Sequence, residues 1–91
     1  MAKAQATTTI ENKTGIHARP ASVFVQKAAS FKDTKVQISA KGKTVDAKSI
    51  LMIMSMGLTK GTEITLIADG PDAKKAVDEL KALVDSKFGE E

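Results

Sequence analysis

Residues 63–89 read EITLIADGPDAKKAVDELKALVDSKFG, and this stretch indicates the fold class more clearly than any other. Over 63–68, side chains alternate along the chain with the period of two that is typical of a half-buried strand. The motif DGPD at 69–72 then predicts a helix start, with Pro71 near the first helical position and acids at the positive end of the dipole. Apolar residues recur on one side of this helix, and Gly89 is expected to end it. These residues are Ala73, Ala76, Val77, Leu80, Leu83, Val84 and Phe88.

The same two periodicities predict five more elements upstream. They are a strand over 4–10, a helix that starts between His17 and Pro20 and reaches Ala28, hairpin strands over 36–40 and 44–47 around a turn at 41–43, and a short helix over 49–56. Ser49 is a suitable N-cap for the short helix, and Gly57 is a suitable residue just beyond its end.

The element order is therefore βαββαβα, which predicts an α+β fold. Strands with two unlike faces and amphipathic helices imply an open-faced β-sandwich, in which three helices cover one face of a four-stranded antiparallel sheet. The other face, with its Thr and Lys side chains, is expected to meet water. Residues 1–91 are expected to form a single domain, because 91 residues suffice for one core and no linker interrupts them.

Composition narrows the classes of function. There is no Cys and only one His, which excludes a disulfide framework and Cys- or His-rich metal sites. No apolar run approaches the roughly 20 residues of a membrane span, and the N-terminus lacks a signal-peptide core. Basic and acidic residues are interspersed and only three residues are aromatic, which disfavours a small RNA-binding domain. We expect a soluble, cytoplasmic monomer without metal, cofactor, membrane insertion or nucleic-acid partner.

The stretch TGIHARPAS at 14–22 contains the only His and the only Arg, His17 and Arg19. A helix start leaves amide hydrogens unpaired beside a positive dipole end, which suits an anion. Arg19 could grip phosphate oxygens in bidentate fashion, and the imidazole of His17 could act as the nucleophile for a phosphoryl group. The residues also fit a surface or capping histidine beside an ordinary solvated arginine, so spacing alone leaves both interpretations open.

The chain lacks a G-x-x-x-x-G-K-[ST] loop for a nucleotide, and no acidic cluster beside His17 marks a magnesium site. If His17 carries phosphate, we therefore expect it to receive the group from a larger protein.

A second stretch, ILMIM at 50–54, is apolar without a break. A helix of two turns can bury only one side, so we expect some of these side chains to remain exposed as a binding surface. Burial of the whole run in the core, as a helix or a strand, is the alternative. Ser49 could act simply as N-cap, or could also accept a phosphate, because phosphate at a helix N-terminus does not melt the helix.

At GIHARPAS (15–22), and at AKSI (47–50) with the apolar helix and MGL (56–58) that follow it, the chain resembles the histidine-containing phosphocarrier (HPr) family of the bacterial phosphoenolpyruvate-dependent sugar phosphotransferase system. The resemblance implies that enzyme I phosphorylates His17 on Nδ1 and that the group passes to sugar-specific enzyme IIA domains. It assigns phosphate neutralisation to Arg19 and support of the phosphate site to Thr14, Ala18 and Pro20. The chain would then be a phosphohistidine carrier rather than a free-standing enzyme.

The resemblance also assigns regulatory phosphorylation to Ser49. In low-GC Gram-positive members an HPr kinase/phosphorylase modifies this serine, and the product is a corepressor for catabolite control protein A in carbon catabolite repression. The implied partner-binding residues are Ile50, Leu51, Met52 and Met54. Met52 departs from the glycine that many Gram-positive members carry there, which puts a bulky side chain on the docking face. The alternative function is a regulatory binding module that acts mainly through Ser49 and its helix.

Overall fold

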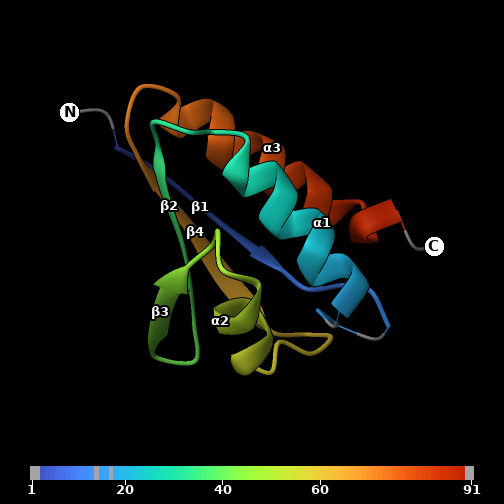
Figure 1. Ribbon diagram of the computed structural model, residues 1–91. Helices are drawn as coiled ribbons and strands as arrows, with labels where there is room; N and C mark the ends of the chain where they lie inside the picture. The colour runs from blue at the N-terminus through green and yellow to red at the C-terminus, as the bar shows by residue number, and fades with distance from the viewer. Residues whose placement is uncertain (1–2, 14, 17, 90–91) are drawn as a thin grey trace.

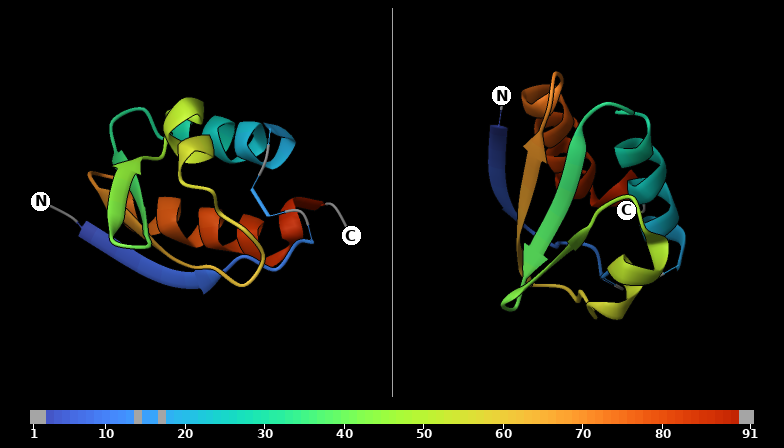
Figure 2. Two further views of the ribbon diagram at one scale, coloured as in Figure 1. Left: turned by 90° about the horizontal axis from the view of Figure 1, so that it is seen from below. Right: turned by 60° about the vertical axis from the view of Figure 1, so that its left-hand side comes forward.

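The computed structural model describes residues 3–13, 15–16 and 18–89. Four antiparallel strands form one sheet in the order β1-β4-β2-β3, and helices cover one of its faces (Figures 1 and 2). The strands are β1 (Lys3–Thr9), β2 (Lys35–Ala40), β3 (Lys43–Asp46) and β4 (Glu63–Asp69), and the helices are α1 (Ala18–Ala29), α2 (Ile50–Ser55) and α3 (Ala73–Asp85). The predicted α+β open-faced sandwich with order βαββαβα is confirmed.

The register of the three long strands separates the two faces of the sheet. Ala6, Leu66 and Ile38 lie side by side across β1, β4 and β2 on the face that packs against the helices. The neighbouring row lies on the opposite face and consists of Thr7, Thr65 and Ser39, which are exposed or half-buried. A polar outer face therefore meets water, as the alternation predicts.

The hairpin between β2 and β3 turns through two residues, Lys41 and Gly42, which both have positive φ angles of 54° and 78°. Two left-handed residues are typical of a tight turn that matches the twist of its strands. Lys43 pairs with Ala40, so it belongs to the strand rather than to the predicted three-residue turn.

The start of α3 differs from the prediction. The helix begins at Ala73, so Pro71 lies two residues before it and not near its first position. The backbone N–H of Asp72 instead donates to Thr34 Oγ1 at 3.1 Å, which holds 71–72 in a turn against the loop before β2. Asp72 is the N-cap residue and so lies at the positive end of the dipole, as expected, but it makes no side-chain capping bond and the first helical turn itself holds no acid.

The end of α3 also differs. The α-helix stops at Asp85, and a 3₁₀ turn over Lys87–Gly89 follows, in which Phe88 has a φ of 56°. This left-handed backbone turns Phe88 into the core, where only 5% of it is exposed. Phe88 thus joins the apolar cluster by a change of chain direction and not by a continued helix.

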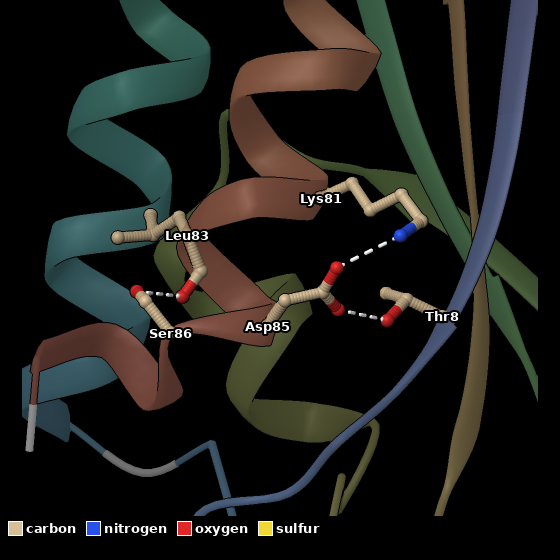
Figure 3. A network of polar contacts seen from close by, with 5 residues as sticks. All are labelled: Thr8, Lys81, Leu83, Asp85 and Ser86. Carbon is tan, nitrogen blue, oxygen red and sulfur yellow. Dashed lines mark hydrogen bonds and ion pairs between the residues drawn. The ribbon is translucent and has the colours of Figure 1, made fainter. Parts of the chain in front are cut away.

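A small polar network joins the C-terminal end of α3 to β1 (Figure 3). Asp85 accepts a hydrogen bond from Lys81 Nζ at 2.8 Å and another from Thr8 Oγ1 on β1, while Ser86 Oγ donates to Leu83 O at 2.9 Å. The bond from Lys81 contributes most, and the bond from Thr8 next, to holding the pKa of Asp85 below its ordinary value.

In the part of the chain that the structure describes, no helix is long and apolar enough to cross a bilayer.

Candidate functional site

The start of α1 places the second half of the motif at 14–22. Ala18 and Arg19 are the first two helical residues and both are exposed, while Pro20 is buried in the first turn. A proline is tolerated there because the first amides of a helix have no partner within it. The predicted helix start, between His17 and Pro20, is confirmed. Thr14 and His17 lie outside the described residues.

The loop before α1 is fixed against the segment that follows α2. Ile16 N donates to Leu58 O at 2.8 Å, and Gly15 has a φ of 68°. A Cβ on Gly15 would lie 2.4 Å from Leu58 O and 2.8 Å from Thr59 Cα, so only glycine fits this approach. The two stretches singled out in the sequence therefore meet in the fold, where α1 and α2 also contact each other.

Asn12 shapes the same loop, a role that sequence reasoning missed. Only 1% of Asn12 is exposed, and its Nδ2 donates to Gly15 O at 2.5 Å while Gly15 N donates back to Asn12 O at 3.1 Å. The spacing of an Asn three residues before a Gly was a turn signal, but it carried no hint that the side chain would be buried.

The caps of α2 are as predicted. Ser49 is the N-cap in extended conformation, and its Oγ accepts a hydrogen bond from Met52 N at 3.3 Å. Gly57, with a φ of 61°, follows the C-cap residue Met56 in the left-handed conformation expected beyond a helix end.

The apolar side chains of α2 divide between core and surface. Ile53 is fully buried, whereas Leu51 is 78% exposed. We call the exposed set the apolar patch, which consists of Ile50, Leu51, Met52 and Met54. The prediction that part of this run stays exposed is confirmed, and its burial as a whole is excluded. Val23, four residues after Arg19 on α1, is a further exposed apolar side chain that the helical pattern did not single out.

Among the described residues, no group of three or more His, Cys, Asp or Glu side chains is placed to hold a metal ion. The arrangement instead offers a helix start with an exposed guanidinium, a glycine-shaped loop and an apolar surface on the neighbouring helix. Such a surface suits contact with another protein.

Known proteins are similar to this chain in sequence and fold. The family model described as the PTS HPr component phosphorylation site matches residues 4–86. Phosphocarrier protein HPr of Vibrio cholerae is 44% identical over 85 residues, which cover 93% of this chain and 96% of that protein. The HPr structure from Thermoanaerobacter tengcongensis superimposes with a TM-score of 0.92 at 45% identity, covering 97% of this chain and 98% of the other.

HPr-like protein Crh of Bacillus subtilis is 49% identical over 72 residues, which cover 79% of this chain and 84% of Crh. A Crh crystal structure, described as a dimer with a swapped domain, has a TM-score of 0.73 at 44% identity and covers 88% of this chain and 91% of that chain. Because that relative is described as a dimer, the monomeric state expected for this chain stays a prediction. With the family model and these relatives spanning most of its length, the chain belongs to the HPr family of phosphocarrier proteins of the phosphotransferase system.

Proposed function

We propose that this chain accepts a phosphoryl group from phospho-enzyme I on His17 and transfers it to enzyme IIA domains in the cytoplasm. The observation that carries the proposal is the exposed Arg19 at the start of α1, two residues after His17 in a motif of the HPr family. The partners need not form lasting complexes, because a carrier must release each one after transfer.

The chemistry asks for few side chains. An imidazole with its ordinary pKa of about 6.5 is mostly neutral at pH 7 and offers a lone pair. As that pair forms the new P–N bond on His17, the bond between phosphorus and the donor atom of enzyme I breaks and its electrons stay with the donor. The guanidinium of Arg19 and the first amides of α1 would meet the charge on the three phosphoryl oxygens. The same steps run again toward enzyme IIA, with this chain as donor.

Docking is proposed to use the apolar patch on α2. Because Ile16 is hydrogen bonded to Leu58 just beyond α2, a partner seated on this patch would also lie over the loop that leads into α1. Exposed methionines suit contacts with several different partners, since their unbranched side chains adapt to different surfaces.

The test charges the chain with phosphoenolpyruvate, magnesium and enzyme I, removes the donor and adds an enzyme IIA domain. We expect acid-labile phosphate on His17 that moves to enzyme IIA, and none on a His17→Ala variant. A chain that charges but never discharges would contradict the carrier role, as would equal charging of His17→Ala.

A second role at Ser49 is proposed beside the first, because Ser49 is a half-buried N-cap directly before the apolar patch. Phosphate there would sit favourably at the helix start and would put two negative charges beside the patch. Support comes also from Crh, whose structure is described as that of a catabolite repression protein. The proposed partners are an HPr kinase/phosphorylase and catabolite control protein A.

Mass spectrometry after incubation with ATP and the kinase tests this role. We expect one phosphate on the chain and none on Ser49→Ala, with about a tenfold or greater loss of charging by enzyme I once Ser49 is modified. Should modified and unmodified chains charge equally fast, phosphorylation of Ser49 would not control the carrier. If Ser49→Ala removed all function while His17→Ala removed none, the chain would instead be a regulatory binding module.

A further inference from the structure

The position of α2 depends on what holds its two ends. The helix has six residues, and Ile53 is the only one of them that is buried. A helix this short has little stability of its own, because nucleation is unfavourable and few hydrogen bonds follow it. Because most of its apolar side chains face solvent, packing stabilises α2 only a little. Contacts at its two ends therefore contribute a large share of what keeps the helix in place.

Lys48 holds the entry to α2. Its Nζ donates to Phe31 O and to Thr34 O, each at 2.8 Å, and the side chain is half-buried. These two carbonyls belong to the turn between α1 and β2, where Thr34 is only 1% exposed. The backbone of Lys48 is held as well as its side chain, since its N–H donates to Asp46 Oδ1 at 2.9 Å. A protonated amine between two carbonyls binds strongly, because a hydrogen bond with a charged donor is stronger than one between neutral groups.

Lys41 holds the exit from α2. It stands at the first position of the β2–β3 turn and has a φ of 54°, where glycine and asparagine are favoured over lysine. From there its Nζ donates to Gly57 O at 2.9 Å, across 16 residues of sequence. Figure 1 shows the turn and the C-terminal end of α2 at the same end of the molecule. A cation at this place also complements the negative end of the helix dipole.

We propose that Lys41 and Lys48 are positioning residues that fix α2 for partner docking. The Lys48 ammonium joins the residue before Ser49 to carbonyls in the turn between α1 and β2, and the Lys41 ammonium joins the β2–β3 turn to the carbonyl of Gly57 beyond the helix. Together these bonds hold the apolar patch in one orientation relative to α1. The inference rests on the proposed function, in which phosphoryl-transfer partners dock on this patch. It predicts a loss in binding of partners and not in the chemical step, because neither lysine belongs to the motif at 14–22.

The experiment uses the full chain with Lys41→Met and Lys48→Met, which keep the unbranched stem and remove the ammonium group. Lys60→Met is the matched control, since Lys60 is exposed in the segment after α2 and makes no hydrogen bond or ion pair among the described residues. Lys41→Arg restores a donor at an exposed site. Two quantities are measured: amide hydrogen exchange along the chain, and kcat and KM for charging by enzyme I.

We expect the amides of 53–57 to exchange about 3- to 10-fold faster in both methionine variants, with α3 unchanged. KM should rise about 3- to 10-fold at unchanged kcat, and Lys60→Met and Lys41→Arg should behave like the wild type. Exchange that is unchanged at 53–57, or faster throughout the chain, would overturn the proposal. So would an unchanged KM, a loss confined to kcat, or the same KM increase in Lys60→Met.

The two readouts separate this inference from the proposed function. If the wild type accepts no phosphate, the carrier role fails, and exchange at 53–57 still decides whether the lysines hold α2. If the wild type charges normally and the variants match it in both readouts, the positioning role alone fails.

Discussion

At the scale of single residues, Arg19 separates a chemical role from a structural one. Its side chain is exposed at the second position of α1, so replacing it should disturb the fold very little. The residue beside it on the inner side, Pro20, is buried and carries the packing of this helix start instead. A functional loss on changing Arg19 would therefore reflect the phosphate site and not the core.

We expect Arg19→Glu to slow charging by enzyme I about 100-fold, because a carboxylate would face the phosphoryl oxygens in place of a guanidinium. The free energy of unfolding should change by less than about 0.5 kcal/mol, as is usual for exposed sites. Transfer kinetics and thermal melting measure the two effects, and Lys75→Glu, an equal charge change on an exposed residue of α3, serves as control. A mainly unfolded Arg19→Glu chain would make this residue structural.

At the scale of elements, features set by neighbouring residues were predicted correctly, whereas contacts between distant segments left no pattern in the sequence. The N-cap at Ser49 and the glycine beyond α2 were predictable, because each bonds or turns within a few residues of itself. The 3₁₀ turn that buries Phe88 was not, because helical periodicity continues through that residue while the backbone does not. Contacts such as Lys41 with Gly57 join distant segments, and no periodicity encodes them.

The join between α3 and β1 should make stability depend on pH. Because Lys81 and Thr8 hold the pKa of Asp85 below its ordinary value, ionised Asp85 favours the folded state. This contribution is complete above the unfolded pKa of about 3.9 and is lost as pH falls through the lower folded pKa. Since Asp85 is 43% exposed, it amounts to about 0.5 kcal/mol.

Denaturant unfolding of the wild type and Asp85→Asn from pH 7 to pH 2 checks this dependence. The wild type should be the more stable of the two at pH 7, and the difference should shrink below about pH 4. A constant difference across that range would show that Asp85 does not titrate differently in the two states.

At the scale of the whole molecule, the fold class and element order followed from the sequence, whereas the strand order β1-β4-β2-β3 did not. Alternation marks which residues face the core but not which strand lies beside which. The strand order places β4 between β1 and β2. Because the end of β1 pairs with the start of β4, the segment that leads into α1 lies beside the segment that follows α2. We propose that residues 1–91 fold as one domain, in which case the unfolding curves above will each show one cooperative transition.

The site is likewise a property of the whole molecule. The motif at 14–22 and the apolar patch are separated along the chain, and the fold joins them through Gly15, Ile16 and Leu58. The sequence contained both parts and the family resemblance suggested the roles proposed for them, but neither indicated the contact between them.

We propose above all that His17 carries phosphate received from enzyme I. Its most direct measurement is mass spectrometry of the intact chain and its peptides after incubation with phosphoenolpyruvate, magnesium and enzyme I, before and after mild acid. We predict one phosphoryl group, located on His17, lost in acid and absent from His17→Ala. A chain that stays unmodified while an HPr of known activity is charged alongside it, or that carries acid-stable phosphate elsewhere, would show that His17 is not the acceptor of the phosphoryl group.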